Sequence, residues 1–351
     1  MASRPLRITY LLESTELWGG NKVVLEQAEL LSDAGNKVTV LSKDAGPAWY
    51  PFKLRVVKAP RFDASTIPDS DIVIGTYWPT VKNAYEAKRG TAVHLCQGYE
   101  GGFKELASFK TAIDEVYSYR IPKLTVSPHM NKFLEERFNA KTYYIGQMLN
   151  RDIFYPQRPF AAGGHPDILN VLVIGPFEAD VKNIRTTLEG VAMARNSLSV
   201  PLKLIRVSQF DLSDDERRII TPDIYHFRVP HLAMGNIYRG ADLLVSMSKA
   251  EEGFGLPPLE AMGCGVPTIL SRIPSHLSYD DPHDYALFVE SDPKAVSEGV
   301  RAMWRDRGLR QSLSKRGLSV AARYTGESVL RRLVRALNEI VAFAGYRSRE
   351  I

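Results

Sequence analysis

Two glutamates, Glu252 and Glu260, flank a glycine-rich turn in the second half of the chain. Gly253 and Gly255 let the backbone bend there and approach a ligand closely. A helix that begins after such a turn points amides and the positive end of its dipole at the turn, where phosphate binds well. The two carboxylates do not lie on one helical face, but they can accept hydrogen bonds from hydroxyl groups on either side of a phosphate. This pattern fits a nucleoside diphosphate sugar, with one glutamate for the ribose and one for the hexose.

Two strands and a short helix must hold these glutamates in place. The apolar runs 243–247 and 268–270 predict buried parallel strands. Pro257 and Pro258 suit the first turn of a helix, and Gly265 can end that helix. The alternative is an ordinary strand, turn and helix of an α/β domain in which both glutamates are solvated.

Length and composition predict two domains and exclude some partners. A chain of 351 residues that is 44% hydrophobic can form two domains, each with its own core. Lys and Arg number 45 against 40 acidic residues. This surplus of five suits phosphorylated ligands or an anionic membrane face better than duplex DNA, and no Lys/Arg run supports binding of nucleic acid.

Cysteines and apolar segments predict a soluble cytoplasmic protein. Cys96 and Cys264 are the two cysteines, and their apolar or Gly-rich surroundings favour buried thiols over a disulfide. They are too few to ligate a metal. The apolar part of the N-terminus is too short for a signal peptide, and nowhere do eighteen apolar residues run together.

The first half of the chain alternates strands with helices. A strand at 7–12, a helix from Gly19 and Gly20 to Gly35 and a strand at 37–41 form a parallel βαβ unit. Further strands are expected at 54–57, 72–74, 92–96, 123–126 and 142–145. The fold class is therefore α/β with a doubly wound sheet. Gly19 and Gly20 then lie at the carboxyl edge, where ligands bind, although a plain tight turn is the alternative.

Aromatic residues follow two of these strands. Tyr77 and Trp78 come after 72–74, and Tyr99 and Glu100 come after 92–96. Aromatic rings beside a glycine-rich turn can stack on a sugar or cover an acceptor. Ordinary packing explains Tyr77 and Trp78 about as well. His94 falls inside its strand and is expected in the core.

A second α/β domain follows an irregular segment. Residues 147–170 contain several prolines and glycines without a clear period, which is typical of a linker. Strands are then expected at 170–174, 202–207, 225–229 and 286–289, and helices at 183–195, 292–307 and 327–344. Lys182, after the first of these strands, can reach a diphosphate as a point charge, or it is simply a solvated lysine. The arginine-rich last helices suggest contact with a membrane surface or a solvated face.

The sequence EGFGLPPLEAMGCGVP resembles the signature of the family 4 retaining glycosyltransferases, in which seven residues separate two glutamates. The resemblance implies a GT-B fold, with two Rossmann-like doubly wound domains facing across a cleft. Residues 1–150 would bind the acceptor and residues 165–326 the nucleotide sugar, with a helix at about 327–351 packing back on the first domain. The donor-binding residues implied are Gly19, Gly20, Lys182, Arg228, Val229, Glu252, Gly253, Phe254, Gly255, Leu256 and Glu260.

The resemblance also implies roles for these residues. Glu252 would hold hydroxyls of the transferred sugar and Glu260 those of the ribose. Amides at Gly255 and Leu256, with Lys182, would stabilise the leaving diphosphate as a metal does elsewhere. Backbone groups around Arg228 and Val229 would bind the edge of the base. Tyr77, Trp78, Tyr99 and Glu100 are the acceptor-side candidates.

Two positions depart from the family pattern. Pro176 stands where an arginine is expected beside the strand-ending glycine, so that Lys182 acts alone or Arg185 substitutes. Gln97 stands where many members carry a histidine, which removes an easy general base. With the following Tyr99 and Glu100 it looks like the rhamnosyltransferase subgroup. Glu252, Lys182 and Gln97 are the catalytic candidates.

Neither a metal nor another cofactor is expected. The Asp69-Ser70-Asp71 sequence matches a pattern with which glycosyltransferases of a different fold hold manganese. It precedes its strand, however, and therefore lies on the amino edge, away from the ligand side, as a solvated cap. Mg²⁺ and Mn²⁺ need several oxygens in octahedral array, and no second acidic cluster ends a strand.

The predicted function is transfer, with retention, of a hexose or deoxyhexose from a UDP-, GDP- or dTDP-sugar. The acceptor would be a glycan, a lipid-linked molecule or a small molecule, in cell-surface polysaccharide or glycoconjugate synthesis, with peripheral contact at the inner membrane face as an option. No carboxylate pair spans one glycosidic bond, which fits a front-side route. The rivals are a GT-B nucleotide-sugar epimerase and a non-catalytic sugar-nucleotide binder. No GxGxxG follows either first strand, which disfavours a dehydrogenase.

Overall fold

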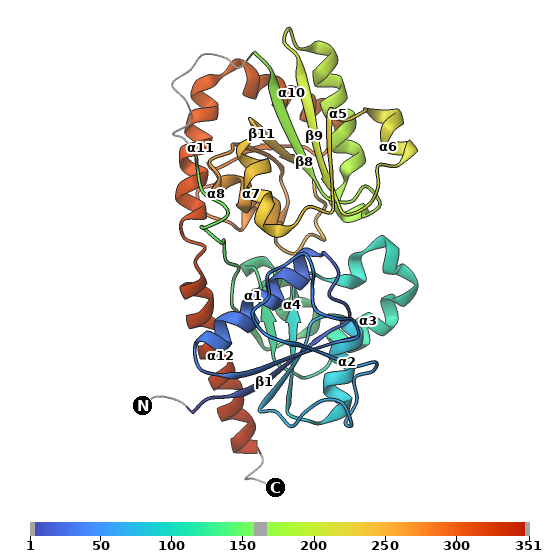
Figure 1. Ribbon diagram of the computed structural model, residues 1–351, viewed down its shortest axis with the longest axis vertical. Helices are drawn as coiled ribbons and strands as arrows, with labels where there is room; N and C mark the ends of the chain where they lie inside the picture. Colours follow the sequence, from blue (N-terminus) through green and yellow to red (C-terminus); the bar gives the residue numbers. More distant parts are fainter. Residues whose placement is uncertain (1–3, 158–166, 348–351) are drawn as a thin grey trace. The chain divides into compact units, whose positions relative to one another are not determined.

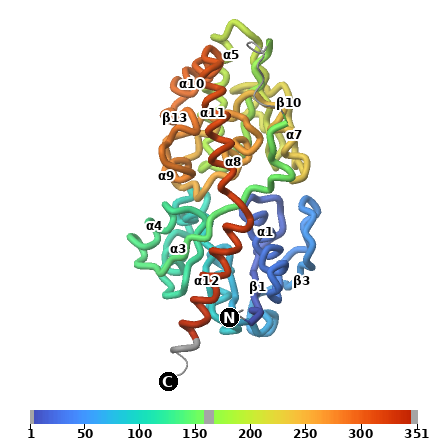
Figure 2. Tube along the Cα trace, turned by 90° about the vertical axis from the view of Figure 1, so that its left-hand side faces the viewer, coloured from blue at the N-terminus to red at the C-terminus, as the bar shows by residue number. Residues whose placement is uncertain are grey.

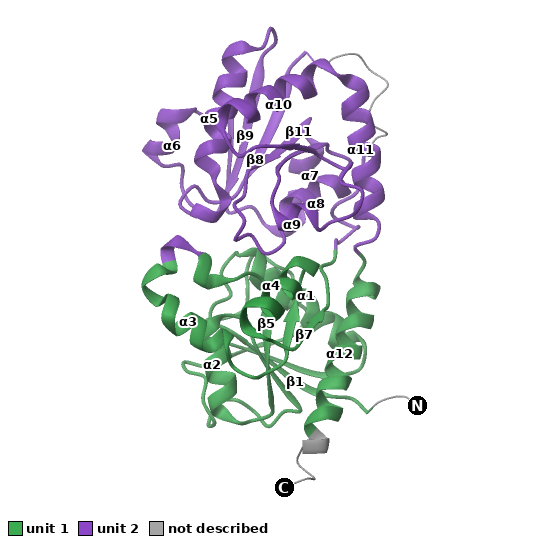
Figure 3. Cartoon of the chain, turned by 180° about the vertical axis from the view of Figure 1, so that it is seen from behind, with its two compact units in different colours: residues 1–102, 106–148, 325–351 green, residues 103–105, 149–324 purple. Residues whose placement is uncertain are grey.

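The chain forms two compact units, which are described in turn. The computed structural model describes residues 4–157 and 167–347 (Figure 1). Unit 1 comprises Met1–Gly102, Leu106–Met148 and Thr325–Ile351, and unit 2 comprises Phe103–Glu105 and Leu149–Tyr324 (Figure 3). Each unit has its own sheet and core.

Unit 1 is built on a seven-stranded parallel sheet in the order β3-β2-β1-β4-β5-β6-β7. The strands are β1 (Arg7–Leu12), β2 (Lys37–Ser42), β3 (Val56–Lys58), β4 (Ile72–Gly75), β5 (Thr91–Cys96), β6 (Lys123–Thr125) and β7 (Thr142–Tyr144). The helices are α1 (Gly19–Asp33), α2 (Trp78–Ala87), α3 (Lys110–Tyr117), α4 (Pro128–Phe138) and α12 (Gly326–Arg347). The central strands are apolar on both faces, as parallel strands covered by helices require.

The strand order of unit 1 reverses between β1 and β4. The chain moves outward from β1 to β2 and β3, then returns to pair β4 with the other side of β1, so that Leu11 lies beside both Leu41 and Gly75. The loops that follow β1 and β4 therefore diverge at the carboxyl edge, and this is where ligands bind in open α/β sheets. Gly19 begins α1 after β1, and Trp78 begins α2 after β4.

Unit 2 repeats this topology with six parallel strands in the order β10-β9-β8-β11-β12-β13. The strands are β8 (Leu169–Ile174), β9 (Leu202–Ser208), β10 (Ile224–Phe227), β11 (Leu243–Ser246), β12 (Thr268–Ser271) and β13 (Leu287–Val289). The helices are α5 (Ile184–Ser197), α6 (Asp214–Ile219), α7 (His231–Arg239), α8 (Leu256–Gly263), α9 (Pro274–Leu277), α10 (Pro293–Arg305) and α11 (Arg307–Ala321). The order reverses between β8 and β11, so the loops after these two strands diverge at the carboxyl edge as they do in unit 1.

The last helix belongs to unit 1, whereas α11 belongs to unit 2. Figure 2 shows α12 running alongside α1. Gly326, the first residue of α12, lies against Leu30 and Met148, and the Arg332 guanidinium lies 4.7 Å from the ring centre of Tyr144. These contacts attach the C-terminal helix to the sheet of unit 1.

The structure confirms the predicted fold class, two doubly wound parallel α/β sheets. Every strand expected from the sequence is present in the described residues, with ends that move by one or two residues. Both cysteines are free and buried, as expected, and burial raises the pKa of each thiol to about 12. Within the described part of the chain, no helix combines the length and apolarity that a membrane crossing requires.

Candidate functional site

An ion pair between Lys182 and Glu252 joins the two loops at the reversal point of unit 2. Lys182 ends a short 3₁₀ helix, η3 (Asp180–Lys182), in the loop after β8. Glu252 lies in the loop after β11. Lys182 Nζ donates to Glu252 Oε2 at 2.6 Å, and the side chains are only 25% and 12% exposed. Two residues that were predicted separately and lie 70 residues apart in the sequence therefore meet at one point.

A second ion pair fixes the same two loops. Lys249 Nζ donates to both carboxylate oxygens of Asp180 at 2.7 Å, and the Lys249 amide donates to the Val181 carbonyl at 2.9 Å. The backbone on each side of Lys182 and Glu252 is thus held by contacts that do not use their side chains.

The Glu252 carboxylate is stabilised in its charged form. Burial alone would raise the pKa of Glu252, but the charge and hydrogen bond of Lys182 outweigh it, helped by His276 and by a hydrogen bond from Ser248. The net effect holds the pKa of Glu252 below its ordinary value. At neutral pH the pair is therefore a lysine cation next to a carboxylate, which can accept hydrogen bonds from hydroxyl groups.

The turn between the two glutamates has, at Gly255, the left-handed backbone for which glycine is suited. Gly255 has φ +83° and precedes α8, in which Pro257 and Pro258 occupy the first turn. A Cβ on Gly255 would lie 2.8 Å from Tyr279 Oη, which donates to the carbonyls of Phe254 and Gly255 at 2.8 and 2.5 Å. Phe254 is buried and packs edge-on against the Tyr279 ring. The buried Tyr279 and Phe254 side chains therefore fix the turn, and the space next to Gly255 has no room for a side chain.

Glu260 lies on α8, one turn from its start, and is buried. Tyr238, on α7, donates its hydroxyl to Glu260 Oε2 at 2.7 Å. Burial and the adjacent Glu260 carboxylate raise the pKa of the Tyr238 phenol well above its ordinary value, so this phenol stays a donor. Glu260 is thus held by another helix of the same unit.

The expected base-binding segment follows β10. Arg228 has φ +49°, and its amide donates to the Ser208 carbonyl at 2.9 Å. The Arg228 side chain is exposed and Val229 is half-buried. This turn lies after β10, two strands from β8 in the order of the sheet.

In unit 1, Gln97 meets the glycine pair after β1. Gln97 directly follows β5, and its Nε2 donates to the Gly20 carbonyl at 3.2 Å. A Cβ on Gly20 would lie 3.3 Å from the same nitrogen. Gly20, in the first turn of α1 with Gly19, therefore allows the close approach of a side chain from β5. His94, as predicted, is fully buried inside β5.

The structure assigns Tyr99 to the core, contrary to the expectation that its ring faces an acceptor. Tyr99 is 8% exposed and packs against Phe133 and Phe138, and its hydroxyl is bonded to Asp114. Helices α3 and α4 supply these partners. The prediction depended on an aromatic residue that follows a strand. This pattern cannot tell whether the ring packs against a ligand or against neighbouring helices.

The other three acceptor-side candidates remain partly accessible. Tyr77 and Trp78 are half-buried at the start of α2, with the Trp78 ring packed against core residues. Glu100 is half-buried and accepts hydrogen bonds from the Tyr117 hydroxyl and the Trp78 amide. Burial raises the pKa of Glu100 to about 7. Its carboxyl group can therefore carry a proton near neutral pH.

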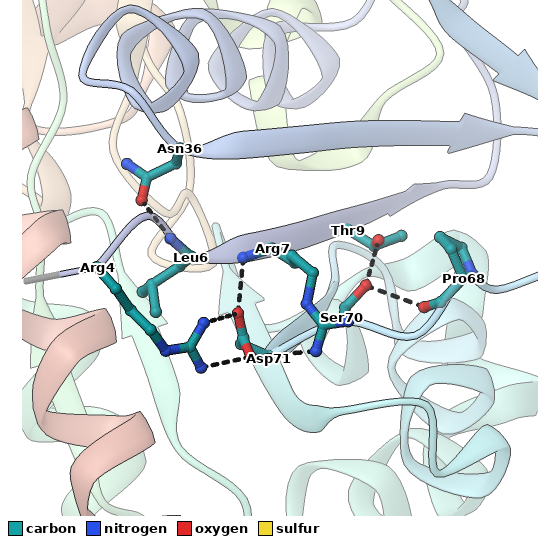
Figure 4. Close-up of polar contacts among 8 residues, drawn as sticks. All are labelled: Arg4, Leu6, Arg7, Thr9, Asn36, Pro68, Ser70 and Asp71. Atoms are coloured by element: carbon teal, nitrogen blue, oxygen red, sulfur yellow. Dashed lines mark hydrogen bonds and ion pairs between the residues drawn. The ribbon is translucent and has the colours of Figure 1, made fainter.

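Asp71 is a structural anchor and lies at the amino edge of the sheet, as predicted. Its carboxylate accepts from Arg4 Nη2 at 2.9 Å and from the Arg7 amide at 2.8 Å (Figure 4). The hydrogen bond from Arg4, with those from Arg7, lowers the pKa of Asp71 to about 2. Asp69 is exposed, but the Asp71 side chain is only 8% exposed, so Asp71 is not the solvated cap expected. Among the described residues, no three His, Cys, Asp or Glu side chains are grouped to hold a metal ion.

Sequence reasoning missed His276 and Tyr279, which line the turn from α9 and from the residues directly after it. His276 is fully buried, its Nδ1 lies 3.1 Å from the Ser271 carbonyl, and its Nε2 lies 3.3 Å from the Cβ position of Gly255. The available signal was their place just after a predicted strand, at the ligand edge.

The fold is GT-B, shared with solved glycosyltransferase structures. The sucrose-phosphate synthase of Thermosynechococcus elongatus is similar with a TM-score of 0.75 and 17% identity, over 95% of this chain and 99% of that one. HepE of Anabaena, solved with UDP and glucose, has a TM-score of 0.76 and 13% identity, over 95% and 99% of the two chains. At these identities the similarity establishes the fold alone.

Sequence comparisons point to the group 1 glycosyltransferases. Residues 215–320 match the family model described as Glycosyl transferases group 1, and this segment contains Glu252 and Glu260. The D-inositol 3-phosphate glycosyltransferase of Corynebacterium urealyticum is 32% identical over 100 residues, 28% of this chain and 23% of that protein. The O-antigen chain mannosyltransferase B of Escherichia coli is 34% identical over 86 residues, 24% of this chain and 22% of that protein. The matched segments span about a quarter of each curated relative, and they support the expected kinship at the level of group 1.

Proposed function

We propose that this chain is a retaining, metal-independent glycosyltransferase that moves a hexose or deoxyhexose from a nucleotide sugar to an acceptor. The observation that carries the proposal is the Lys182–Glu252 pair next to the Gly255 turn. Glu252 and Gly255 lie within the segment 215–320 that matches group 1 glycosyltransferases. A cation, a left-handed glycine turn and a helix start together suit a diphosphate, and the adjacent carboxylate suits sugar hydroxyls. HepE, which has the same fold, was solved with UDP-glucose.

Each residue has a defined task in this mechanism. Lys182 and the amides of Gly255 and Leu256 stabilise the charge that grows on the leaving diphosphate. Glu252 accepts hydrogen bonds from the transferred sugar, and Glu260, oriented by Tyr238, accepts them from the ribose. The backbone at Arg228 and Val229 binds the base. The acceptor hydroxyl attacks C1 of the sugar, the bond from C1 to the diphosphate breaks, and the hydroxyl proton passes to a leaving phosphate oxygen.

Unit 1 is assigned to the acceptor. Four candidates follow the carboxyl ends of β4 and β5, namely Tyr77, Trp78, Gln97 and Glu100. Of these, Gln97 contacts the glycine pair that begins α1. Gln97 is placed to orient a hydroxyl group, since an amide can donate and accept but cannot remove a proton at neutral pH. We extend the proposal to acceptors of cell-surface glycan synthesis, including lipid-linked ones at the inner membrane face, and to a deoxyhexose such as rhamnose as the transferred sugar.

A thermal-shift screen tests the donor, followed by an assay of turnover. UDP-, GDP- and dTDP-sugars are compared with and without EDTA, and binding of one or a few of them is expected to raise the midpoint in both conditions. Glu260→Ala should largely abolish the shift. Nucleoside diphosphate release should then require an acceptor, and the product should keep the anomeric configuration by NMR. Conversion of the donor without acceptor would identify an epimerase instead, and tight binding without any turnover would identify a binding protein.

A further inference from the structure

Arg206 is a fully buried arginine inside unit 2, one strand away from the Lys182 loop. It lies on β9, and its guanidinium makes four hydrogen bonds. Nη1 donates to the carbonyls of Val173 and Val207 at 2.9 and 3.2 Å, Nη2 donates to the Gly175 carbonyl at 3.1 Å, and Nε donates to Glu216 Oε1 at 2.5 Å. Glu216, on α6, is also buried and balances the charge.

Stability alone is a weak reason for this arrangement. Removing an arginine and a carboxylate from water costs much free energy, and well-packed apolar side chains often replace a buried ion pair without loss. The guanidinium does supply donors for the carbonyls at the end of the central strand β8, where the sheet ladder stops. The arrangement is therefore specific for the backbone around Gly175.

Both backbone polar groups of Gly175 are hydrogen-bonded. Its amide donates to the Val207 carbonyl at 3.0 Å, and its own carbonyl accepts from Arg206. Gly175 has φ +128°, a conformation that glycine adopts readily and other residues rarely adopt, so these two hydrogen bonds select one of several conformations open to it. The loop that begins here leads to Lys182.

Gly175 in turn supports the side chain of Lys182. A Cβ on Gly175 would lie 3.4 Å from Lys182 Cγ, which means that the lysine stem passes directly over this residue. A displaced Gly175 would therefore move the ammonium group that meets Glu252. The arginine that the family pattern places beside the strand-ending glycine is Pro176 in this chain, which has neither charge nor amide hydrogen.

We infer that Arg206 is a positioning residue of the donor site, which holds the Gly175 turn so that Lys182 can serve the diphosphate without a second exposed arginine. Arg206 acts through the backbone and does not touch the donor. The inference rests on the proposed function, because it assumes that Lys182 binds the donor diphosphate.

The test compares a nucleoside diphosphate with its nucleoside, because only the former needs Lys182. Arg206→Met/Glu216→Leu removes the pair without leaving a buried carboxylate, and Arg206→Lys keeps the charge with fewer donors. Arg195→Met is the matched control, since Arg195 pairs with Asp223 beside the same sheet and does not contact Gly175. Affinities are measured by isothermal titration and ligand-observed NMR, with melting curves to confirm folding.

We expect the double variant to lose at least about tenfold in affinity for the diphosphate, with nucleoside affinity unchanged and a smaller loss for Arg206→Lys. Adding Lys182→Met should cause little further loss, because both changes remove the same interaction. Unchanged diphosphate affinity in a folded variant would overturn the inference, and so would an equal loss for diphosphate and nucleoside. If the wild-type protein binds no nucleoside diphosphate, the proposed function fails first and the inference fails with it.

Discussion

The Lys182–Glu252 pair can be tested by a double-mutant cycle. At 2.6 Å and an effective dielectric constant of about 20, the attraction between the two charges is about 6 kcal/mol before the cost of removing them from water is subtracted. The net contribution of an exposed ion pair to stability is about 0.2–1 kcal/mol. Removing one partner of a buried pair costs about 3–5 kcal/mol. Because these side chains are 25% and 12% exposed, we expect a coupling energy of about 1–3 kcal/mol.

The two single variants should differ in a direction that the structure sets. Lys182→Met leaves the less exposed partner, Glu252, as a carboxylate without its cation, and should lower the free energy of unfolding by about 2–3 kcal/mol. Glu252→Gln leaves Lys182, whose flexible stem can carry its charge toward water, and should cost about 1 kcal/mol. The double variant should be more stable than the sum of the two losses implies.

Urea unfolding at pH 7 measures this cycle, and the Lys249–Asp180 pair provides the control. Those side chains are 40% and 36% exposed, so their coupling should stay at about 0.2–1 kcal/mol. Ligand binding separates the two roles: Lys182→Met should weaken binding of nucleoside diphosphate and of nucleotide sugar alike, whereas Glu252→Gln should weaken the nucleotide sugar alone. Additive stabilities within about 0.5 kcal/mol, or an equal effect of Glu252→Gln on both ligands, would refute the reasoning.

Three further predictions concern the turn, the acceptor unit and the thiols. Gly255→Ala should abolish the donor-induced thermal shift and should lower the free energy of unfolding more than Gly35→Ala does. Both glycines have φ above +80°, but of the two only Gly255 lacks room for a Cβ. Equal losses of stability for the two variants in chemical denaturation would contradict this. The free energy of unfolding should fall by about 1–3 kcal/mol as pH rises from about 4.5 to 7. Burial raises the pKa of Glu100 in the folded state to about 7, so in this range the folded protein keeps a proton that the unfolded chain releases. Glu100→Gln should flatten that part of a pH series of urea unfolding curves, and an unaltered slope would exclude the shift. Cys96 and Cys264 should react with a thiol reagent only on unfolding, because burial raises both pKa values to about 12; rapid labelling of the native protein would show that they are accessible.

Short sequence patterns were sufficient to predict the fold. Continuous apolar runs such as 170–174 and 243–247 can only be buried strands in a chain that alternates with helices, and glycines marked the turns at their carboxyl ends. The two prolines after Gly255 identified the start of α8 for the same reason, because only the first turn of a helix tolerates them. These features depend on a few adjacent residues, and a single sequence contains them.

Contacts between distant segments could not be predicted in this way. Lys182 and Glu252 are 70 residues apart, and Tyr238 and Glu260 are 22 apart; neither pairing follows from spacing along one element. The prediction for Tyr99 was wrong for the same reason. Its position after a strand suggested a ligand, but the side chains of α3 and α4 fill that space, and their approach depends on packing of the whole unit. Asp71 likewise binds Arg4 and Arg7 across neighbouring strands.

The different charges at the carboxyl edges of the two sheets argue for different ligands. In unit 2 the loops after β8 and β11 present a lysine next to a left-handed glycine turn, which suits a diphosphate. At the carboxyl edge of unit 1, Gln97 follows β5, is neutral and donates to the Gly20 carbonyl in the first turn of α1. Burial raises the pKa of Glu100 to about 7, so this carboxyl carries only part of a negative charge at neutral pH. A neutral amide and a partly protonated carboxyl suit the hydroxyls of an acceptor better than a phosphate. Gln97→Ala should therefore leave nucleoside diphosphate affinity within about twofold of the wild type while lowering kcat; a large loss of nucleotide affinity would contradict this division between the units.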